Sequence, residues 1–391
     1  MNWNAKFFLE NWMSLSSDHL TSKRLIDTKI PGSHDSNTYT LENQFVVGHF
    51  GTCQNIPVSE QLKLGVRYID IRYGEDDNEP GKLIDQHGPL KGENIWKHFI
   101  EIAEFCHSHP KEFILINFQN ESNIHPKTKE KIIWKLNGIL GNLLVNSLDI
   151  HEWFDLSTVT FEQIWQREKR VLLLSFGNHL FQDCGLDISD VWKLGILSFD
   201  EHKVSEWHNV NDVDDLLKRN LEQIESRPHN KIFVSQFILT AESDVMSFIK
   251  NILFFRVPTI FKFVERLLKG SKLHLFFVEH LHKNFNVVLL DFVNFDIDLL
   301  FLIIASNFSS KLTIHKAYIG SKDFTEKISE KISISQILYI PCLFKLCKKL
   351  NTPIGTLTVI YSYGDSPLMV AQSKTKRFSF RQSLQLLLRR Y

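Results

Sequence analysis

Short apolar segments rich in β-branched residues recur along most of the chain and alternate with segments of helical periodicity. This alternation constrains the fold more than any other feature, because strands that alternate with helices build parallel sheets. Eight strands are predicted, at residues 25–30, 66–73, 83–86, 113–118, 171–176, 196–199, 231–237 and 286–293. Helices are expected between them, at residues 95–108, 128–144 and 212–224. Eight such strands over roughly 270 residues indicate an α/β fold of the TIM-like (β/α)8 barrel type, either regular or distorted.

The pattern changes after residue 309. Residues 311–319 and 357–363 alternate between apolar and polar side chains, which is typical of half-buried strands. We therefore divide the chain into a barrel at residues 1–309 and a small β-rich module at residues 310–391.

The composition narrows the class of protein. The 45 Lys and Arg residues balance 45 Asp and Glu residues, whereas a general nucleic-acid binder carries a basic excess. The 5 cysteines are scattered without zinc-site spacing, which predicts reduced thiols. No signal peptide or transmembrane stretch is recognised, so we expect a protein that is cytoplasmic or exported without a signal peptide.

The motif IPGSHDS follows the first predicted strand, where Pro31 and Gly32 are expected to end it. His34 and Asp35 then stand at the carboxyl end of the strand, which is where catalytic groups gather in parallel barrels. The alternative is a turn in which Asp35 caps a helix and His34 has no function.

Two further motifs, RYIDIRYG and LIDQHGPLKG, add an arginine and a second histidine. Strand alternation places Asp70 and Arg72 on one face, where they either serve function or form a buried ion pair that stabilises the barrel. His87 shares a face with Asp85 at the end of a later strand. Two histidines suit a paired general base and general acid, and a guanidinium offers fixed donors to phosphate oxygens.

Together these motifs resemble the X domain of the phosphatidylinositol-specific phospholipases C, in the small bacterial and eukaryotic X-domain-containing forms. The resemblance is carried by IPGSHDS, CQNIPVSEQLKLGVRYIDIRYG, HGPLKG and HPKEFILINF, and it returns at NVVLLDFV near the end of the barrel. It implies a phospholipase C that cleaves phosphatidylinositol to diacylglycerol and inositol 1,2-cyclic phosphate.

The resemblance also implies roles for five residues. His34 would take the proton from the inositol 2-hydroxyl, which then attacks phosphorus. His87, assisted by Asp35, would protonate the departing diacylglycerol oxygen. Arg72 would hold the phosphate, and Asp291 would orient His34.

Departures from the family pattern bear on the metal and the headgroup. Asp35 and Gln119 stand where Ca²⁺-dependent members carry an asparagine and a glutamate, and Arg72 brings a positive charge to the place of the ion. We therefore expect a Ca²⁺-independent enzyme without a metal. Gln119 also replaces a family lysine, and an arginine is missing near Ser175. The candidate substrate-binding residues are Gln119 and Asp200.

Residues 248–269 are the best candidate for contact with a bilayer. They hold five phenylalanines and five basic residues against one acid, Glu265. A helix opened by Pro258, with Phe261 and Val264 on one face, would suit a membrane surface, or would be an ordinary outer helix of the barrel. The expected partner is a membrane that contains phosphatidylinositol. We also expect a monomer, no nucleic acid, and a protein partner for the C-terminal module.

Two other functions stay open. Glycerophosphodiester phosphodiesterases share a barrel and a histidine pair, but they need a metal site with acids close to the first histidine, which the sequence does not show. A catalytically weak inositol-lipid-binding module is favoured by the missing headgroup charges and disfavoured by the retained catalytic residues.

Overall fold

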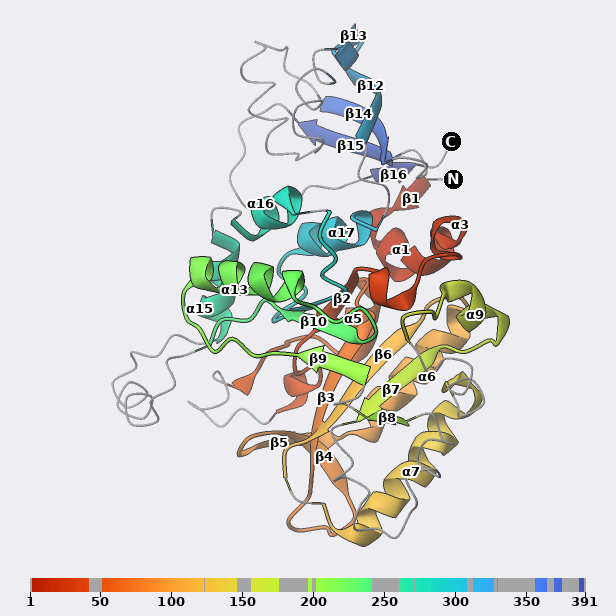
Figure 1. The fold of residues 1–391 in the computed structure, drawn as a ribbon, viewed down its shortest axis with the longest axis vertical. Coiled ribbons are helices and arrows are strands. Elements are labelled where there is room, and N and C mark those ends of the chain that lie inside the picture. Colours follow the sequence, from red (N-terminus) through yellow and green to blue (C-terminus); the bar gives the residue numbers. More distant parts are fainter. Residues whose placement is uncertain are drawn as a thin grey trace.

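Eight parallel strands form one curled sheet in the computed structural model of the chain (Figure 1). The strands are β2 (Ile30–Ser33), β3 (Tyr68–Glu75), β6 (Ile114–Asn120), β7 (Val171–Ser175), β8 (Ile196–Ser198), β9 (Lys203–Ser205), β10 (Ile232–Gln236) and β11 (Val287–Leu290). The structure describes residues 2–41, 51–122, 124–145, 156–175, 196–198, 202–240, 260–269, 272–280, 282–307, 312–326, 329, 356–363, 369–374 and 387–389.

The strand order confirms the expected barrel type in an open form. Along the sheet it runs β8-β7-β6-β3-β2-β11-β10-β9. The first barrel strand, β2, pairs with the last, β11, as in a closed barrel. Within the described residues β8 and β9 do not pair with each other, so the sheet is curled and open at that point.

One predicted barrel strand is wrong and one is missing from the prediction. Residues 83–86 belong to β4 (Leu83–His87), which forms an antiparallel hairpin with β5 (Leu90–Asn94) and pairs with β3 outside the ring. The strand that completes the eight is β9, whose three residues include a lysine and a serine and therefore give no apolar run.

The first predicted strand is displaced along the chain. Residues Leu25–Asp27 form a 3₁₀ turn, η1, and Pro31 and Gly32 lie inside β2 rather than ending it. A Cβ atom on Gly32 would lie 3.0 Å from Cγ1 of Val287 and 3.2 Å from Cβ of Tyr68. The glycine thus permits close packing of β2 between β3 and β11. The first strand therefore lies at Ile30–Ser33 instead of residues 25–30, and the turn with His34 follows it directly.

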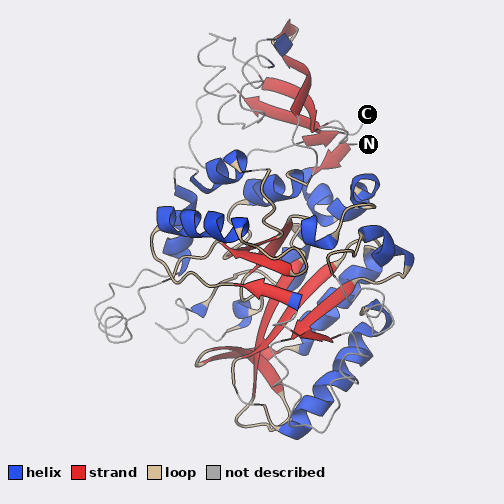
Figure 2. Ribbon diagram, viewed as in Figure 1, coloured by secondary structure: helices blue, strands red, loops and turns tan. Residues whose placement is uncertain are grey.

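Helices surround the sheet (Figure 2). They are α1 (Ala5–Glu10), α2 (Trp12–Leu15), α3 (Ser17–Leu20), α5 (Val58–Lys63), α6 (Trp96–Ser108), α7 (Pro126–Leu140), α9 (Phe161–Gln166), α13 (Val213–Glu225), α15 (Ile260–Leu268), α16 (Lys272–Glu279) and α17 (Ile297–Ala305), with 3₁₀ turns η2 (Thr38–Thr40) and η3 (Gly141–Leu143). The three predicted helices correspond to α6, α7 with η3, and α13. In the part of the chain that is described, none of the helices has the length and apolar character needed to cross a membrane.

Two buried apolar clusters hold these layers together. Tyr68 of β3 belongs to the cluster that includes Trp12 and Leu20 of the N-terminal helices. Its neighbour Ile69 belongs to the other cluster, with Phe99 of α6. Successive residues of β3 therefore pack on opposite faces of the sheet, as strand alternation requires.

A second sheet follows the barrel. Its strands are β12 (Leu312–Ile319), β13 (Lys322–Asp323), β14 (Thr356–Tyr363) and β15 (Met369–Lys374), in the antiparallel order β13-β12-β14-β15. The strands predicted from alternation are β12 and β14. A short pair, β1 (Asn2–Asn4) with β16 (Leu387–Arg389), joins the two ends of the chain. The division into domains at residue 309 stays a prediction.

Candidate active site

A cavity of about 550 Å³ lies at the carboxyl ends of the barrel strands. Its polar lining includes His34, Asp35, Arg72, His87 and Asp291, so the five predicted catalytic residues meet in one place. They come from the turn after β2, from β3, from the end of β4 and from the segment after β11.

His34 is held between two carboxylates. Its Nδ1 atom lies 2.8 Å from Oδ1 of Asp291, and its Nε2 atom lies 3.5 Å from Oδ1 of Asp35. Burial alone lowers the pKa of His34, but the charges of Asp35 and Asp291 outweigh it and raise the pKa to about 9. An imidazole with its Nδ1 bonded to a carboxylate presents Nε2 as its reactive atom.

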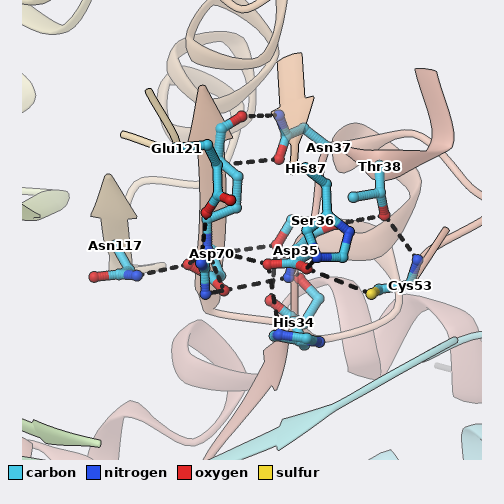
Figure 3. Close-up of polar contacts among 12 residues, drawn as sticks. His34, Asp35, Ser36, Asn37, Thr38, Cys53, Asp70, His87, Asn117 and Glu121 are labelled. Atoms are coloured by element: carbon cyan, nitrogen blue, oxygen red, sulfur yellow. Dashed lines mark hydrogen bonds and ion pairs between the residues drawn. The ribbon is translucent and has the colours of Figure 1, made fainter. Parts of the chain in front are cut away.

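Asp35 connects the other catalytic groups (Figure 3). Its carboxylate lies 3.0 Å from Nε of Arg72 and 3.4 Å from Nε2 of His87, in addition to its contact with His34. Burial raises the pKa of Asp35, yet His34, Arg72 and His87 together bring it well below its usual range. Asp35 also has a left-handed backbone with φ of 41°, a conformation that aspartate adopts more readily than most residues. The predicted helix-cap alternative is therefore not what the structure contains.

Arg72 lies among three carboxylates. Besides Asp35, its guanidinium pairs with Oδ2 of Asp70 at 3.1 Å and with Oε1 of Glu121 at 2.9 Å. Ca²⁺ needs six to eight oxygen ligands, and here the guanidinium already binds the carboxylates that could supply them. Three carboxylates of the cavity are thus paired with Arg72, and independence of Ca²⁺ stays a prediction.

A buried network fixes the turn that carries His34 and Asp35. The Asn37 side chain donates to the carbonyl of Arg72 at 2.7 Å and accepts from its backbone N–H at 3.0 Å. The same side chain donates to Asp85, which pairs with His98 of α6 at 2.9 Å. Asp85 therefore makes its hydrogen bonds within this network, behind the site.

His87 is oriented by the backbone. Its Nδ1 atom lies 2.8 Å from the carbonyl oxygen of Gly51, so Nδ1–H donates and Nε2 faces Asp35. The following residue, Gly88, donates its backbone N–H to Glu121 at 3.3 Å. Glu121 thereby links the His87 turn to the Arg72 guanidinium.

The candidate substrate-binding residues have different outcomes. Gln119 lines the cavity and is the β6 register partner of Arg72. Asp200 lies outside the described residues. Strand alternation correctly placed Asp70 and Arg72 on one face, and their predicted ion pair is itself part of the site.

Sequence reasoning missed several residues that line the cavity. Lys203 of β9 donates to Oδ1 of Asn117 at 2.8 Å and to the hydroxyl of Tyr68 at 3.4 Å, and Asn117 donates to Asp70 at 2.6 Å. Glu121 was also missed, although it lies two residues after Gln119, directly past the end of β6. Lys203 had no such signal because β9 itself was not recognised.

The helix expected at residues 258–269 begins at Ile260, and residues 248–259 lie outside the described part. Its predicted apolar face is partly wrong, since Phe263, Val264 and Leu267 are buried whereas Phe261 is 43% exposed. Phe261 instead contacts the Phe295 ring, with centroids 4.9 Å apart. The helix therefore packs on the barrel through one side.

Comparison with solved structures identifies the fold. The phosphatidylinositol-specific phospholipase C from Listeria monocytogenes superposes with a TM-score of 0.57 at 21% identity, covering 76% of this chain and 98% of that one. A variant of the phosphatidylinositol-specific phospholipase C from Staphylococcus aureus gives a TM-score of 0.54 at 15% identity, covering 78% and 100%. The chain thus has the distorted TIM-barrel fold of these bacterial proteins.

Comparison with sequences gives a family match over part of the chain. Residues 28–175 match the family model of the phosphatidylinositol-specific phospholipase C X domain. The mouse PI-PLC X domain-containing protein 2 is 23% identical over 290 residues, which cover 67% of this chain and 80% of the relative. The human PI-PLC X domain-containing protein 3 is 24% identical over 263 residues, covering 61% and 76%. The match over residues 28–175 confirms the resemblance to this family that the motifs predicted.

Proposed function

We propose that the chain is a metal-independent phospholipase C that cleaves phosphatidylinositol by intramolecular transfer to a cyclic phosphate. The X domain supports the class of reaction. The observation that carries the mechanism is the position of Asp35, within 3.5 Å of both histidines and of Arg72 in one cavity.

In the first step His34 acts as general base. Its Nε2 atom takes the proton of the inositol 2-hydroxyl, and the hydroxyl oxygen forms a bond to phosphorus. Asp291 holds the ring through Nδ1 and stabilises the imidazolium that results. The Arg72 guanidinium donates to the phosphate oxygens as their negative charge grows.

In the second half of the reaction His87 acts as general acid. The bond from phosphorus to the glycerol oxygen breaks with its electron pair, and Nε2 of His87 gives that oxygen its proton. Diacylglycerol leaves and inositol 1,2-cyclic phosphate remains. Asp35, 3.4 Å from this nitrogen, and the Gly51 carbonyl at Nδ1 hold the ring in position for this transfer.

Arg72 takes the part that a metal has in other enzymes of this chemistry. A fixed cation beside the phosphate neutralises developing charge without a bound ion. The three carboxylates around Arg72 hold the guanidinium in place.

We also propose that the protein acts peripherally on membranes that contain phosphatidylinositol. The cavity is lined on one side by apolar residues, among them Leu239, Ile260 and Phe263, and by Trp207, which is 58% exposed. Such residues suit the interface between headgroup and acyl chains. We further propose that the C-terminal sheet binds a protein partner and that the protein is a monomer.

The experiment is an assay of diacylglycerol release from phosphatidylinositol vesicles. His34→Ala and His87→Ala should each lower kcat by about 10²–10⁴, whereas His229→Ala, at an exposed histidine, should leave it unchanged. Wild-type protein that binds these vesicles without releasing diacylglycerol would favour the lipid-binding module. Release from glycerophosphodiesters but not from phosphatidylinositol would favour the other phosphodiesterase class.

A further inference from the structure

Cys53 lies at the centre of the site but has no part in the reaction described above. Its side chain is buried, and Sγ lies 3.4 Å from Oδ2 of Asp35 (Figure 3). Nε2 of His87 lies 3.4 Å from the same oxygen. The three ligand atoms are all within 4.8 Å of one another. A thiol, a carboxylate and an imidazole therefore converge on one point.

Two of the three spacings among these atoms match those of a tetrahedral zinc site. Zn²⁺ binds sulfur at about 2.3 Å and nitrogen or oxygen at about 2.0–2.1 Å, which separates neighbouring ligand atoms by about 3.3–3.6 Å. The two distances from Asp35, to Cys53 and to His87, are both 3.4 Å. The third distance, from Sγ of Cys53 to Nε2 of His87, is within 4.8 Å.

The surroundings of His87 favour metal binding as well. Histidines that bind metals usually donate their second ring N–H to a carbonyl or a carboxylate. The Nδ1 atom of His87 is 2.8 Å from the carbonyl oxygen of Gly51. Nε2 is thus the atom with the free lone pair whenever the ring is neutral.

The charges nearby have two opposite effects. Arg72 lies 3.0 Å from Asp35 and repels a cation, whereas Asp70 and Asp291 add negative charge to the cavity. Burial and the nearby carboxylates raise the pKa of the Cys53 thiol well above its usual value. An ion must therefore displace the thiol proton, and its affinity should rise with pH.

We propose that Asp35, Cys53 and His87 form an inhibitory site for a thiophilic divalent ion of the Zn²⁺ type. The bound ion replaces the protons of the Cys53 thiol and of His87 Nε2, which are released to water. His87 then has no proton for the leaving group, and Oδ2 of Asp35 is occupied by the ion. The inhibitory effect rests on the proposed function, whereas binding of the ion does not.

Co²⁺ is the probe, because a thiolate bound to Co²⁺ gives a ligand-to-metal charge-transfer absorption that free thiols lack. The full-length reduced protein is titrated with Co²⁺ and then with Zn²⁺, which should displace it. Wild type should show the absorption, and Cys53→Ser should lose it and bind Zn²⁺ at least about tenfold more weakly. Cys106→Ser, at a buried cysteine outside the site, should behave as wild type.

A second variant keeps the test conclusive if Cys53→Ser misfolds. His87→Ala keeps the thiol and should weaken Zn²⁺ binding about tenfold or more. The proposal is overturned if wild type gives no thiolate absorption, or if the absorption is unchanged in Cys53→Ser.

Activity is a separate readout. Micromolar Zn²⁺ should inhibit wild type and Cys106→Ser, and a chelator should restore both. If the protein binds Co²⁺ through Cys53 but never releases diacylglycerol, the proposed function fails while the metal site stands.

Discussion

Asp35 touches three functional side chains, so single substitutions around it have distinguishable effects. Asp291 acts on His34, and Asp70 and Glu121 act on Arg72. In the proposed mechanism one carboxylate sets the basicity of His34, and two hold the Arg72 guanidinium that binds the phosphate. Two predictions separate these roles.

The first concerns the pH dependence of kcat/KM. With a pKa of about 9, His34 is protonated at neutral pH, and only about one molecule in a hundred holds the neutral base at pH 7. The rate should rise with pH until the pKa of His34 is passed. Asp291→Asn removes a charge that raises this pKa, so the rising limb should move to lower pH. The maximal rate should also fall, by at least about tenfold, because the imidazolium loses its counter-charge.

The measurement is the pH profile of kcat/KM for wild type and Asp291→Asn, with Asp214→Asn on an exposed part of α13 as control. A rising limb at the same pH in wild type and in Asp291→Asn would contradict the assigned pairing of His34 with Asp291.

The second prediction concerns Arg72. Lysine keeps the positive charge but cannot bond three carboxylates and a phosphate in one plane. Arg72→Lys should lower kcat by about 10²–10³, and Arg219→Lys, whose arginine pairs with Asp215 on the surface, should not. Steady-state kinetics on phosphatidylinositol vesicles measures both. Equal rates for Arg72→Lys and wild type would show that only the charge matters.

At the scale of elements, two short segments bring the site together. The β4–β5 hairpin carries His87, and the turn after β2 carries His34 and Asp35. Asn37 and Asp85 join these segments to β3, and His98 of α6 closes the network from behind. Because all of these groups are buried, each depends on its partner for a hydrogen bond.

This network predicts a positioning effect of His98. Replacement by leucine leaves Asp85 with one buried bond fewer, which should lower the free energy of unfolding by about 1–3 kcal/mol. It should also lower kcat with little change in KM, because the turn with His34 shifts. Glutamine, which can still donate to Asp85, should restore much of the rate. Chemical denaturation and vesicle kinetics test this together, and a stability loss without any loss of kcat would make the network purely structural.

Sequence alone predicted the elements with strong local patterns. The motif around His34 and the alternation of Asp70 and Arg72 on β3 predicted candidate residues that the structure brings together in one cavity. Their catalytic roles stay a prediction. The antiparallel direction of β4 was not predictable, because an apolar run carries no record of its partner strand. Lys203 and Glu121 were missed because their interactions are with residues of other strands, which the local sequence pattern does not reveal.

At the scale of the whole molecule, the N-terminal helices are tied to the barrel by one buried ion pair. Glu112 accepts from Arg67 of the segment before β3 and from the backbone of Met13 and Ser14, and both charged side chains are fully buried. Such a pair is costly to break, because the remaining charge stays buried without a partner.

Glu112→Ala should therefore lower the free energy of unfolding by about 3–5 kcal/mol. Glu60→Ala, which removes an exposed pair with Lys63, should change it by about 0–1 kcal/mol. Urea denaturation followed by circular dichroism measures both. Similar small changes in the two variants would mean that the N-terminal helices contribute little to the stability of the barrel.

The central claim is that Arg72, rather than a metal, supports transfer of the phosphate to the inositol 2-hydroxyl. The most direct measurement is ³¹P NMR of the protein with phosphatidylinositol vesicles in excess EDTA. We predict a signal of inositol 1,2-cyclic phosphate that grows with time and is absent with His34→Ala. No signal in EDTA, followed by turnover once Ca²⁺ is added in excess, would contradict the account.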